Sequence, residues 1–104
     1  RLLDGAPLRV VVDDASHLAG PTLASFERLW PHVALNGWYC IEDWGTGYWG
    51  WWPDGATPAL VRSRVGHDSG MVGAVKQLVD LLHDDPFCDR IELFTGQAFF
   101  HKRA

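Results

Sequence analysis

Two short apolar runs in the first half of the chain end abruptly in acidic residues. Residues 8–12 read Leu-Arg-Val-Val-Val and are followed by two aspartates, and residues 38–41 read Trp-Tyr-Cys-Ile and are followed by Glu-Asp. A near-continuous apolar run of this length is typical of a parallel strand that is covered on both faces. The pattern therefore predicts two parallel strands, each with acids at its carboxyl end.

A helix with one apolar face is predicted between these strands. It opens at Gly20-Pro21, since proline is tolerated in the first turn of a helix, and Pro31 limits its end. Asn36-Gly37 is a turn signal before the second strand. The apolar face consists of residues at helical spacing, namely Leu23, Phe26, Leu29, Trp30 and Val33. Strand, helix and strand together form one right-handed βαβ unit.

The second half of the chain predicts a further helix and a hairpin. Apolar positions recur at helical spacing from about 69 to 83, and Asp84-Asp85-Pro86 stops this helix. Residues 91–95 alternate as a strand, Gly96-Gln97 suits a tight turn, and residues 98–102 return antiparallel. The predicted order is strand, helix, strand, long loop, helix, strand and strand, which is an α/β fold whose last strand is antiparallel.

Two right-handed crossovers that extend a sheet in one direction place both helices on the same face. The other face is then bare, and the first strand lies at an edge although it reads as an interior strand. Bare apolar faces and edges promote aggregation. Because the chain begins with Arg1 rather than Met, we expect a missing amino-terminal half of the same protein to cover them, with a homo-oligomer as the other possibility.

Composition narrows the class of protein. The 104 residues suffice for one domain at most, and the net charge of −4 with no run of Lys and Arg argues against a nucleic-acid partner. No stretch approaches the roughly 20 apolar residues of a membrane span. Two cysteines without a CxxC motif, and no signal peptide, favour a cytoplasmic location.

The acids at the strand ends form a candidate metal site. Asp14 and His17 follow the first strand, and Glu42 and Asp43 follow the second. Ligands of open α/β sheets bind beyond the carboxyl ends of the strands, and adjacent strands lie about 4.8 Å apart. Three carboxylates suit a hard divalent cation, Mg²⁺ by preference. His17 is a candidate general base, and a helix cap is the alternative for it.

A tryptophan-rich segment follows directly from the acid pair. The chain has six tryptophans, and four of them lie within residues 44–52. Aromatic side chains beside an acid-lined cleft bind sugars or flat apolar ligands, although they can also fill a core or an interface. Residues 44–68 show no clear period and are rich in Gly, Pro and Trp, so we expect a substrate-side loop there.

Four motifs resemble one family of enzymes. They are VVDDASH at residues 11–17, FERLWPHV at 26–33, GWYCIED at 37–43 and TGYW at 46–49. These motifs are similar to the metal-dependent sugar O-methyltransferases of macrolide biosynthesis, of the macrocin and mycinamicin type. The group of cephalosporin hydroxylases and rhamnosyl O-methyltransferases is close by. The motifs cover residues 8 to about 50, and beyond them the resemblance rests on the order of elements.

The resemblance implies that residues 1–104 are the carboxy-terminal part of a single, Rossmann-like class I methyltransferase domain. It implies S-adenosylmethionine as the methyl donor. No Gly-rich turn follows a strand here, so most of the donor site is expected upstream. Ala15 departs from the family pattern, which usually has Gly at this place. The implied site consists of the Mg²⁺ ligands Asp14, Glu42 and Asp43, the base His17, and the substrate-binding residues Tyr48 and Trp49.

Three functions stay open on the sequence. The leading prediction is an O-methyltransferase that acts on a hydroxyl of a sugar, a glycoside or another small molecule with a vicinal diol. The second is a non-catalytic module that binds carbohydrates or aromatic ligands and keeps the fold. The third is a metal-dependent hydroxylase or hydrolase built on the same half-sheet.

Overall fold

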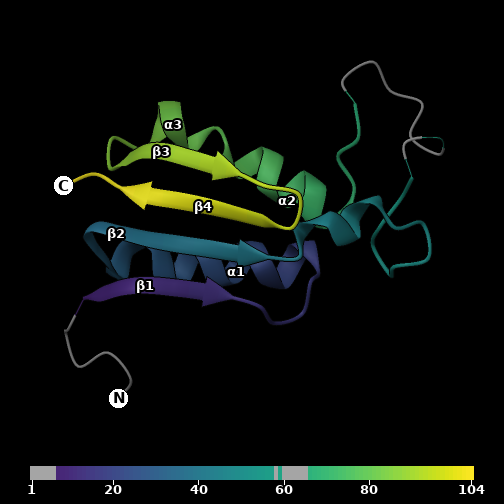
Figure 1. Ribbon diagram of the computed structural model, residues 1–104, viewed down its shortest axis with the longest axis horizontal. Helices are drawn as coiled ribbons and strands as arrows, with labels where there is room; N and C mark the ends of the chain where they lie inside the picture. The colour runs from purple at the N-terminus through teal and green to yellow at the C-terminus, as the bar shows by residue number, and fades with distance from the viewer. Residues whose placement is uncertain (1–6, 58, 60–65) are drawn as a thin grey trace.

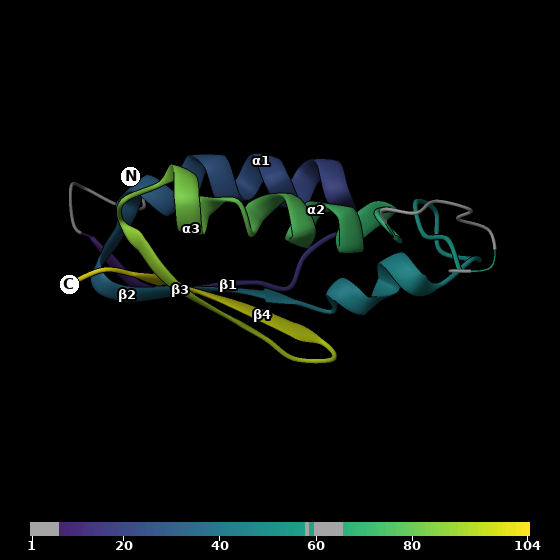
Figure 2. The same ribbon diagram turned by 90° about the horizontal axis from the view of Figure 1, so that it is seen from above.

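The computed structural model describes residues 7–57, 59 and 66–104. It consists of a four-stranded sheet with the helices packed on one face (Figures 1 and 2). Part of the predicted 44–68 loop, namely residues 58 and 60–65, lies outside the described residues. The elements in chain order are β1 (Leu8–Asp13), α1 (Ala19–Leu29), η1 (Trp30–His32), β2 (Val33–Glu42), η2 (Trp44–Tyr48), α2 (Gly70–Leu78), α3 (Leu81–Asp84), β3 (Cys88–Leu93) and β4 (Gln97–Lys102).

The sheet has the strand order β1-β2-β4-β3. β1 and β2 run parallel, whereas β4 is antiparallel to both of its neighbours. The α/β fold predicted from the sequence is therefore confirmed, including the antiparallel last strand and the edge position of β1. β4, the second strand of the hairpin, lies between β2 and β3. The connection from β2 to β3 therefore crosses over β4.

The pairing of β1 with β2 fixes where the predicted site lies. Val12 pairs with Cys40, and Asp13 pairs with Ile41. The two strands are parallel and end together, so their acidic carboxyl ends lie at the same edge of the sheet (Figure 1). This edge adjoins η2 and the long loop.

The prediction that a turn at Asn36-Gly37 precedes the second strand was wrong, because both residues lie inside β2. Asn36 has a left-handed φ of 66°, and the register of β1 against β2 shifts between Leu8 and Val10. The turn signal thus produces an irregularity within a longer strand. A Cβ at position 37 would lie 2.7 Å from the backbone oxygen of Arg9, so the close approach of β1 requires glycine there.

The second helix is also shorter than predicted. It breaks at Val79-Asp80 into α2 and α3, because several hydrogen bonds there run from residue i to i−3 rather than i−4 and tighten the chain. β3 begins at Cys88, which pairs with Lys102 of β4, so this strand starts earlier than residue 91. Leu82 is 50% exposed, although its spacing assigns it to the apolar stripe.

The core lies between the helices and the covered face of the sheet. An aromatic cluster at its centre is built around Phe26 of α1, whose ring lies 5.2 Å from Trp30, 4.6 Å from Tyr39 and 5.3 Å from Phe100. The buried apolar residues packed with them are Val33, Ile41, Met71, Val75, Leu78, Cys88 and Ala98. Alternation along the strands sends the side chains of Tyr39, Ile41 and Phe100 toward the helices and those of their neighbours to the opposite face.

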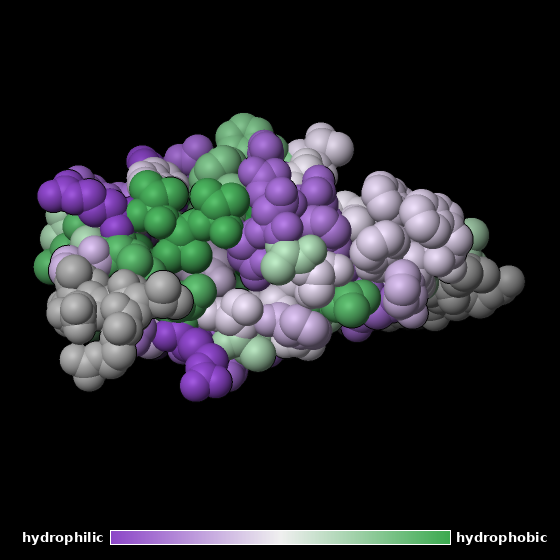
Figure 3. All heavy atoms as spheres, turned by 90° about the horizontal axis from the view of Figure 1, so that it is seen from below, coloured by the Kyte–Doolittle hydropathy of each residue, from purple (hydrophilic) through white to green (hydrophobic). Residues whose placement is uncertain are grey.

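The opposite face of the sheet carries no helix within the described part of the chain (Figure 2). Val10 and Val12 of β1 are 61% and 57% exposed there. Figure 3 views the β1 edge and shows apolar surface gathered on it near the start of the strand. A shallow hollow of about 500 Å³ on this open face is lined by Val10, Val12, Trp38, Cys40, Glu42, Glu92, Phe94 and Phe99. Within the described residues, no helix has the length and apolar character needed to cross a membrane.

We expect the isolated 104-residue polypeptide to self-associate through this open face, because burial of apolar surface contributes about 25 cal/mol per Å². Val12→Lys should shift its sedimentation toward a smaller species. Val11→Lys is the matched control, since Val11 packs against the core and its replacement should unfold the chain instead. A wild-type polypeptide that sediments as a cooperative monomer at every concentration would contradict this expectation.

Candidate active site

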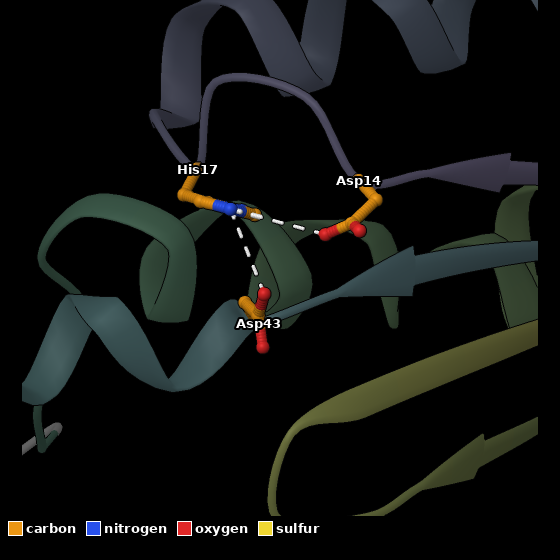
Figure 4. Close-up of side chains that lie close together, drawn as sticks. All are labelled: Asp14, His17 and Asp43. Carbon is orange, nitrogen blue, oxygen red and sulfur yellow. Dashed lines mark ion pairs between the residues drawn. The ribbon is translucent and has the colours of Figure 1, made fainter.

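Three side chains meet at the carboxyl ends of β1 and β2. Asp14 directly follows β1, His17 lies in the connection to α1, and Asp43 links β2 to η2. Figure 4 shows the imidazole of His17 directed toward both carboxylates. The strand-end rule therefore brings together residues that lie far apart in the sequence.

The geometry of this cluster fits a cation site. His17 Nε2 lies 3.8 Å from Asp14 Oδ1 and 3.5 Å from Asp43 Oδ2. Both separations are longer than a well-formed hydrogen bond, so the three groups do not saturate one another. One ligand atom from each residue lies within 4.8 Å of the others. Two carboxylates and an imidazole are donors that divalent cations accept in proteins.

The surroundings of the imidazole set which nitrogen can react. The side chains of Asp14 and Asp43 are 62% and 57% exposed, whereas that of His17 is 23% exposed. His17 Nδ1 is buried and has no hydrogen-bond partner among the described residues. Nε2 is therefore the ring atom that faces the carboxylates and can exchange a proton with a bound group.

Two residues of the cluster have a strained backbone. His17 has a φ of 54° and Asp43 a φ of 57°, both in the left-handed region. Such residues cost about 1–3 kcal/mol each and cluster at functional sites. The backbone N–H of Asp43 donates to the carbonyl of Gly96 at 2.6 Å, which ties this residue to the turn of the β3–β4 hairpin.

The carboxylate of Glu42 is not part of this cluster in the structure. It accepts from Gln97 Nε2 at 3.4 and 3.5 Å, and Cys40 Sγ lies 3.9 Å from its Oε1. Burial, with a further contribution from the negative charge of Glu42, raises the pKa of the Cys40 thiol to about 11. The Cys40 thiol is therefore protonated at neutral pH in the absence of a metal ion.

Tyr48 and Trp49 adjoin Asp43. The three residues line one cavity of about 450 Å³, together with Trp44, Gly45, Thr46, Thr95 and Gly96. Tyr48 is 38% exposed and Trp49 is 44% exposed, so both present aromatic surface to a ligand. The cavity thus combines a carboxylate of the cluster with the aromatic side chains that suit a sugar ring.

The sequence assigned no role to Thr46 or Trp52, although both contact the segment that carries His17. Thr46 Oγ1 and Trp52 Nε1 donate to the backbone carbonyl of His17. Thr46 belongs to the TGYW motif at residues 46–49, and Trp52 belongs to the concentration of tryptophans in residues 44–52. Nothing in that signal distinguished Trp52 from its neighbours.

The fold is shared with a segment of a known methyltransferase. The structure superimposes on the MycE methyltransferase of the mycinamycin biosynthetic pathway, solved in complex with Mg, SAH and mycinamycin VI, with a TM-score of 0.71 and 30% sequence identity. The match covers 91% of this chain and 25% of that chain. No protein-family model matches the sequence.

Curated relatives identify the group more closely. Over 84 residues the chain is 32% identical to the 8-demethyl-8-α-L-rhamnosyl tetracenomycin-C 2′-O-methyltransferase of Streptomyces olivaceus, covering 81% of this chain and 20% of that protein. Over 76 residues it is 38% identical to the demethylmacrocin O-methyltransferase of Streptomyces fradiae, covering 73% of this chain and 18% of that protein. The resemblance to sugar O-methyltransferases of the macrocin and mycinamicin type is therefore confirmed, and the chain is homologous to a segment of these enzymes.

Proposed function

We propose that this chain forms the acceptor-activating part of an S-adenosylmethionine- and Mg²⁺-dependent O-methyltransferase that acts on a hydroxyl of a sugar or glycoside. The observation that carries the proposal is the cluster of Asp14, His17 and Asp43 at the ends of two parallel strands. Support comes from the MycE complex with Mg, SAH and mycinamycin VI, to which this chain is similar.

Asp14 and Asp43 are the proposed cation ligands, with Glu42 as the third. Asp13 pairs with Ile41, so the next residues of the two strands, Asp14 and Glu42, follow side by side in the register. The contacts of Glu42 with Gln97 are at the long limit of hydrogen bonds, so their exchange for a cation costs little. When bound, Mg²⁺ lowers the pKa of a coordinated hydroxyl, and S-adenosylmethionine supplies an electrophilic methyl group.

His17 is the proposed general base. Its Nε2 faces the carboxylates of Asp14 and Asp43, which are the proposed cation ligands. Its Nδ1 is buried. Nε2 accepts the proton of the acceptor hydroxyl while the oxygen of that hydroxyl forms a bond to the methyl carbon and the carbon–sulfur bond breaks.

Tyr48 and Trp49 are the proposed contacts for the sugar ring of the acceptor. Their exposed aromatic faces and the carboxylate of Asp43 line the same cavity, which can orient a ring with its hydroxyls toward the acids. The chain spans 20% and 18% of the two curated relatives described above. We assign the binding of the methyl donor to the remainder of the full-length protein.

Removal of a proposed ligand should weaken cation binding. We expect Asp14→Asn, Asp43→Asn and Glu42→Gln each to lower the affinity of the full-length protein for Mn²⁺ by more than about 10-fold, since even the loss of a ligand's supporting contact costs about 10–100-fold. Isothermal titration calorimetry measures this. Glu92→Gln is the matched control, because Glu92 lies on the open face beside Arg90 and should leave the affinity unchanged. Unchanged Mn²⁺ affinity in all three ligand variants would remove the site.

Removal of the proposed base should affect turnover and spare cation binding. His17→Ala in the full-length protein should lower kcat by about 10²–10⁴-fold, the range for a general base, with the Mn²⁺ affinity nearly intact. Transfer of a radiolabelled methyl group from S-adenosylmethionine to a glycoside gives the rate. His32→Ala, an exposed histidine of η1, is the control and should retain wild-type turnover. Wild-type turnover of His17→Ala would exclude the role of base.

A further inference from the structure

We propose that Trp52 is a positioning residue that holds His17 in its active orientation, with Asp54 as its partner in the same loop. The inference rests on the proposed function of His17 as the base. Residues 49–56 of the long loop then have a second role, in addition to contact with the substrate. The contacts that carry it all lie within the described residues.

The first attachment is at the backbone of His17 itself. The indole Nε1 of Trp52 donates a hydrogen bond of 2.8 Å to the carbonyl oxygen of His17, and Thr46 Oγ1 donates another of 3.3 Å to the same atom. A carbonyl oxygen accepts two hydrogen bonds, so both of its positions are used. The peptide plane that follows His17 is therefore fixed from two points of the loop segment that begins at η2.

The second attachment lies two residues further along. Asp54 Oδ2 accepts a hydrogen bond of 2.8 Å from the backbone N–H of Ala19, the first residue of α1. Leu18, which precedes the helix, makes no side-chain cap of its own. Asp54 thus serves as the cap of α1 from a distant part of the sequence, and the segment from His17 to Ala19 is held at both ends.

The clamp formed by Trp52 and Asp54 is itself held by packing. The ring of Trp52 lies 6.2 Å from the imidazole of His17, tilted by 52°, and it meets Trp49 and Trp51 edge-on at 5.9 and 5.7 Å. At Gly70, a Cβ would lie 2.6 Å from the backbone oxygen of Asp54 and 2.7 Å from its Oδ1. The start of α2 therefore packs directly against Asp54.

These contacts explain how His17 keeps its left-handed backbone. A φ of 54° is uncommon for a residue with a side chain, and it directs Nε2 between Asp14 and Asp43. Loss of the indole N–H leaves the carbonyl of His17 with the longer bond from Thr46 alone, and this allows the backbone to relax toward an ordinary conformation. Nε2 then moves away from the carboxylates, while the carboxylates stay in place.

The test compares two tryptophans of the same cluster in the full-length protein. Trp52→Phe keeps an aromatic ring and removes the N–H, so we expect kcat to fall by about 10- to 100-fold, as for other contacts that orient a site residue. The KM for the acceptor and the affinity for Mn²⁺ should stay at wild-type values. Trp51→Phe is the matched control, because the Trp51 indole is 76% exposed and has no contact with the His17 carbonyl; it should retain the wild-type kcat.

A second pair of variants covers the case in which Trp52→Phe does not fold. Asp54→Asn keeps an oxygen that accepts from the N–H of Ala19 and should retain most of the wild-type kcat. Asp54→Ala removes this acceptor and should show the same fall in kcat as Trp52→Phe. Equal kcat values for Asp54→Ala and Asp54→Asn would overturn the proposal.

A measurement without turnover separates this inference from the proposed function. In ¹⁵N-histidine spectra, the ring nitrogens of His17 should give one set of signals in the wild-type protein and in Trp51→Phe. In Trp52→Phe they should be broadened or doubled, because the ring samples more than one orientation. Wild-type signals in Trp52→Phe would overturn the positioning role. A wild-type protein that transfers no methyl group would instead overturn the proposed function, and the spectra would still decide the role of Trp52.

Discussion

The parallel pairing of β1 with β2 is the interaction on which the candidate site depends. The pairs Val12–Cys40 and Asp13–Ile41 end the two strands together, so that Asp14 and Asp43 leave the sheet at the same edge. A slip of one residue would send every side chain of a strand to the other face. The alternating burial of β1, with Val11 against the core and Val12 exposed, sets this register. The packing of an apolar core thus determines the geometry of an acidic cluster.

Elements set by local pattern were predicted well, and elements set by distant contacts were not. The two apolar strands and α1 carry their signals within a few residues, and the structure has them. The apolar spacing from 69 to 83 continues through the break between α2 and α3, so periodicity alone could not reveal it. The signal at Asn36-Gly37 was real, but the close approach of β1 turned it into an irregularity of a longer strand.

The sequence likewise predicted the residues of the site that follow the strands, but not the contacts that distant residues make with them. The strand-end rule placed Asp14, His17 and Asp43 in one region, and the structure brings them within reach of one another. The side chain of Glu42 lies outside this cluster and contacts Gln97 of β4, a strand whose position in the sheet the sequence did not specify. The contact of Trp52 with His17 joins residues that are 35 positions apart, and no periodicity or motif encodes such a pair.

The strain at His17 gives a physical reason for the contacts that residues 46–54 of the long loop make beside the strand ends. A left-handed residue costs about 1–3 kcal/mol, and a net hydrogen bond contributes about 0.5–1.5 kcal/mol. The two bonds to the His17 carbonyl and the bond from Ala19 to Asp54 are therefore of the size needed to offset that strain. A loop that only covered a substrate would require no such hydrogen bonds to residues 17–19, which connect β1 to α1. Because the loop supplies them, its folding and the orientation of His17 are coupled, and a change in one is expected to alter the other.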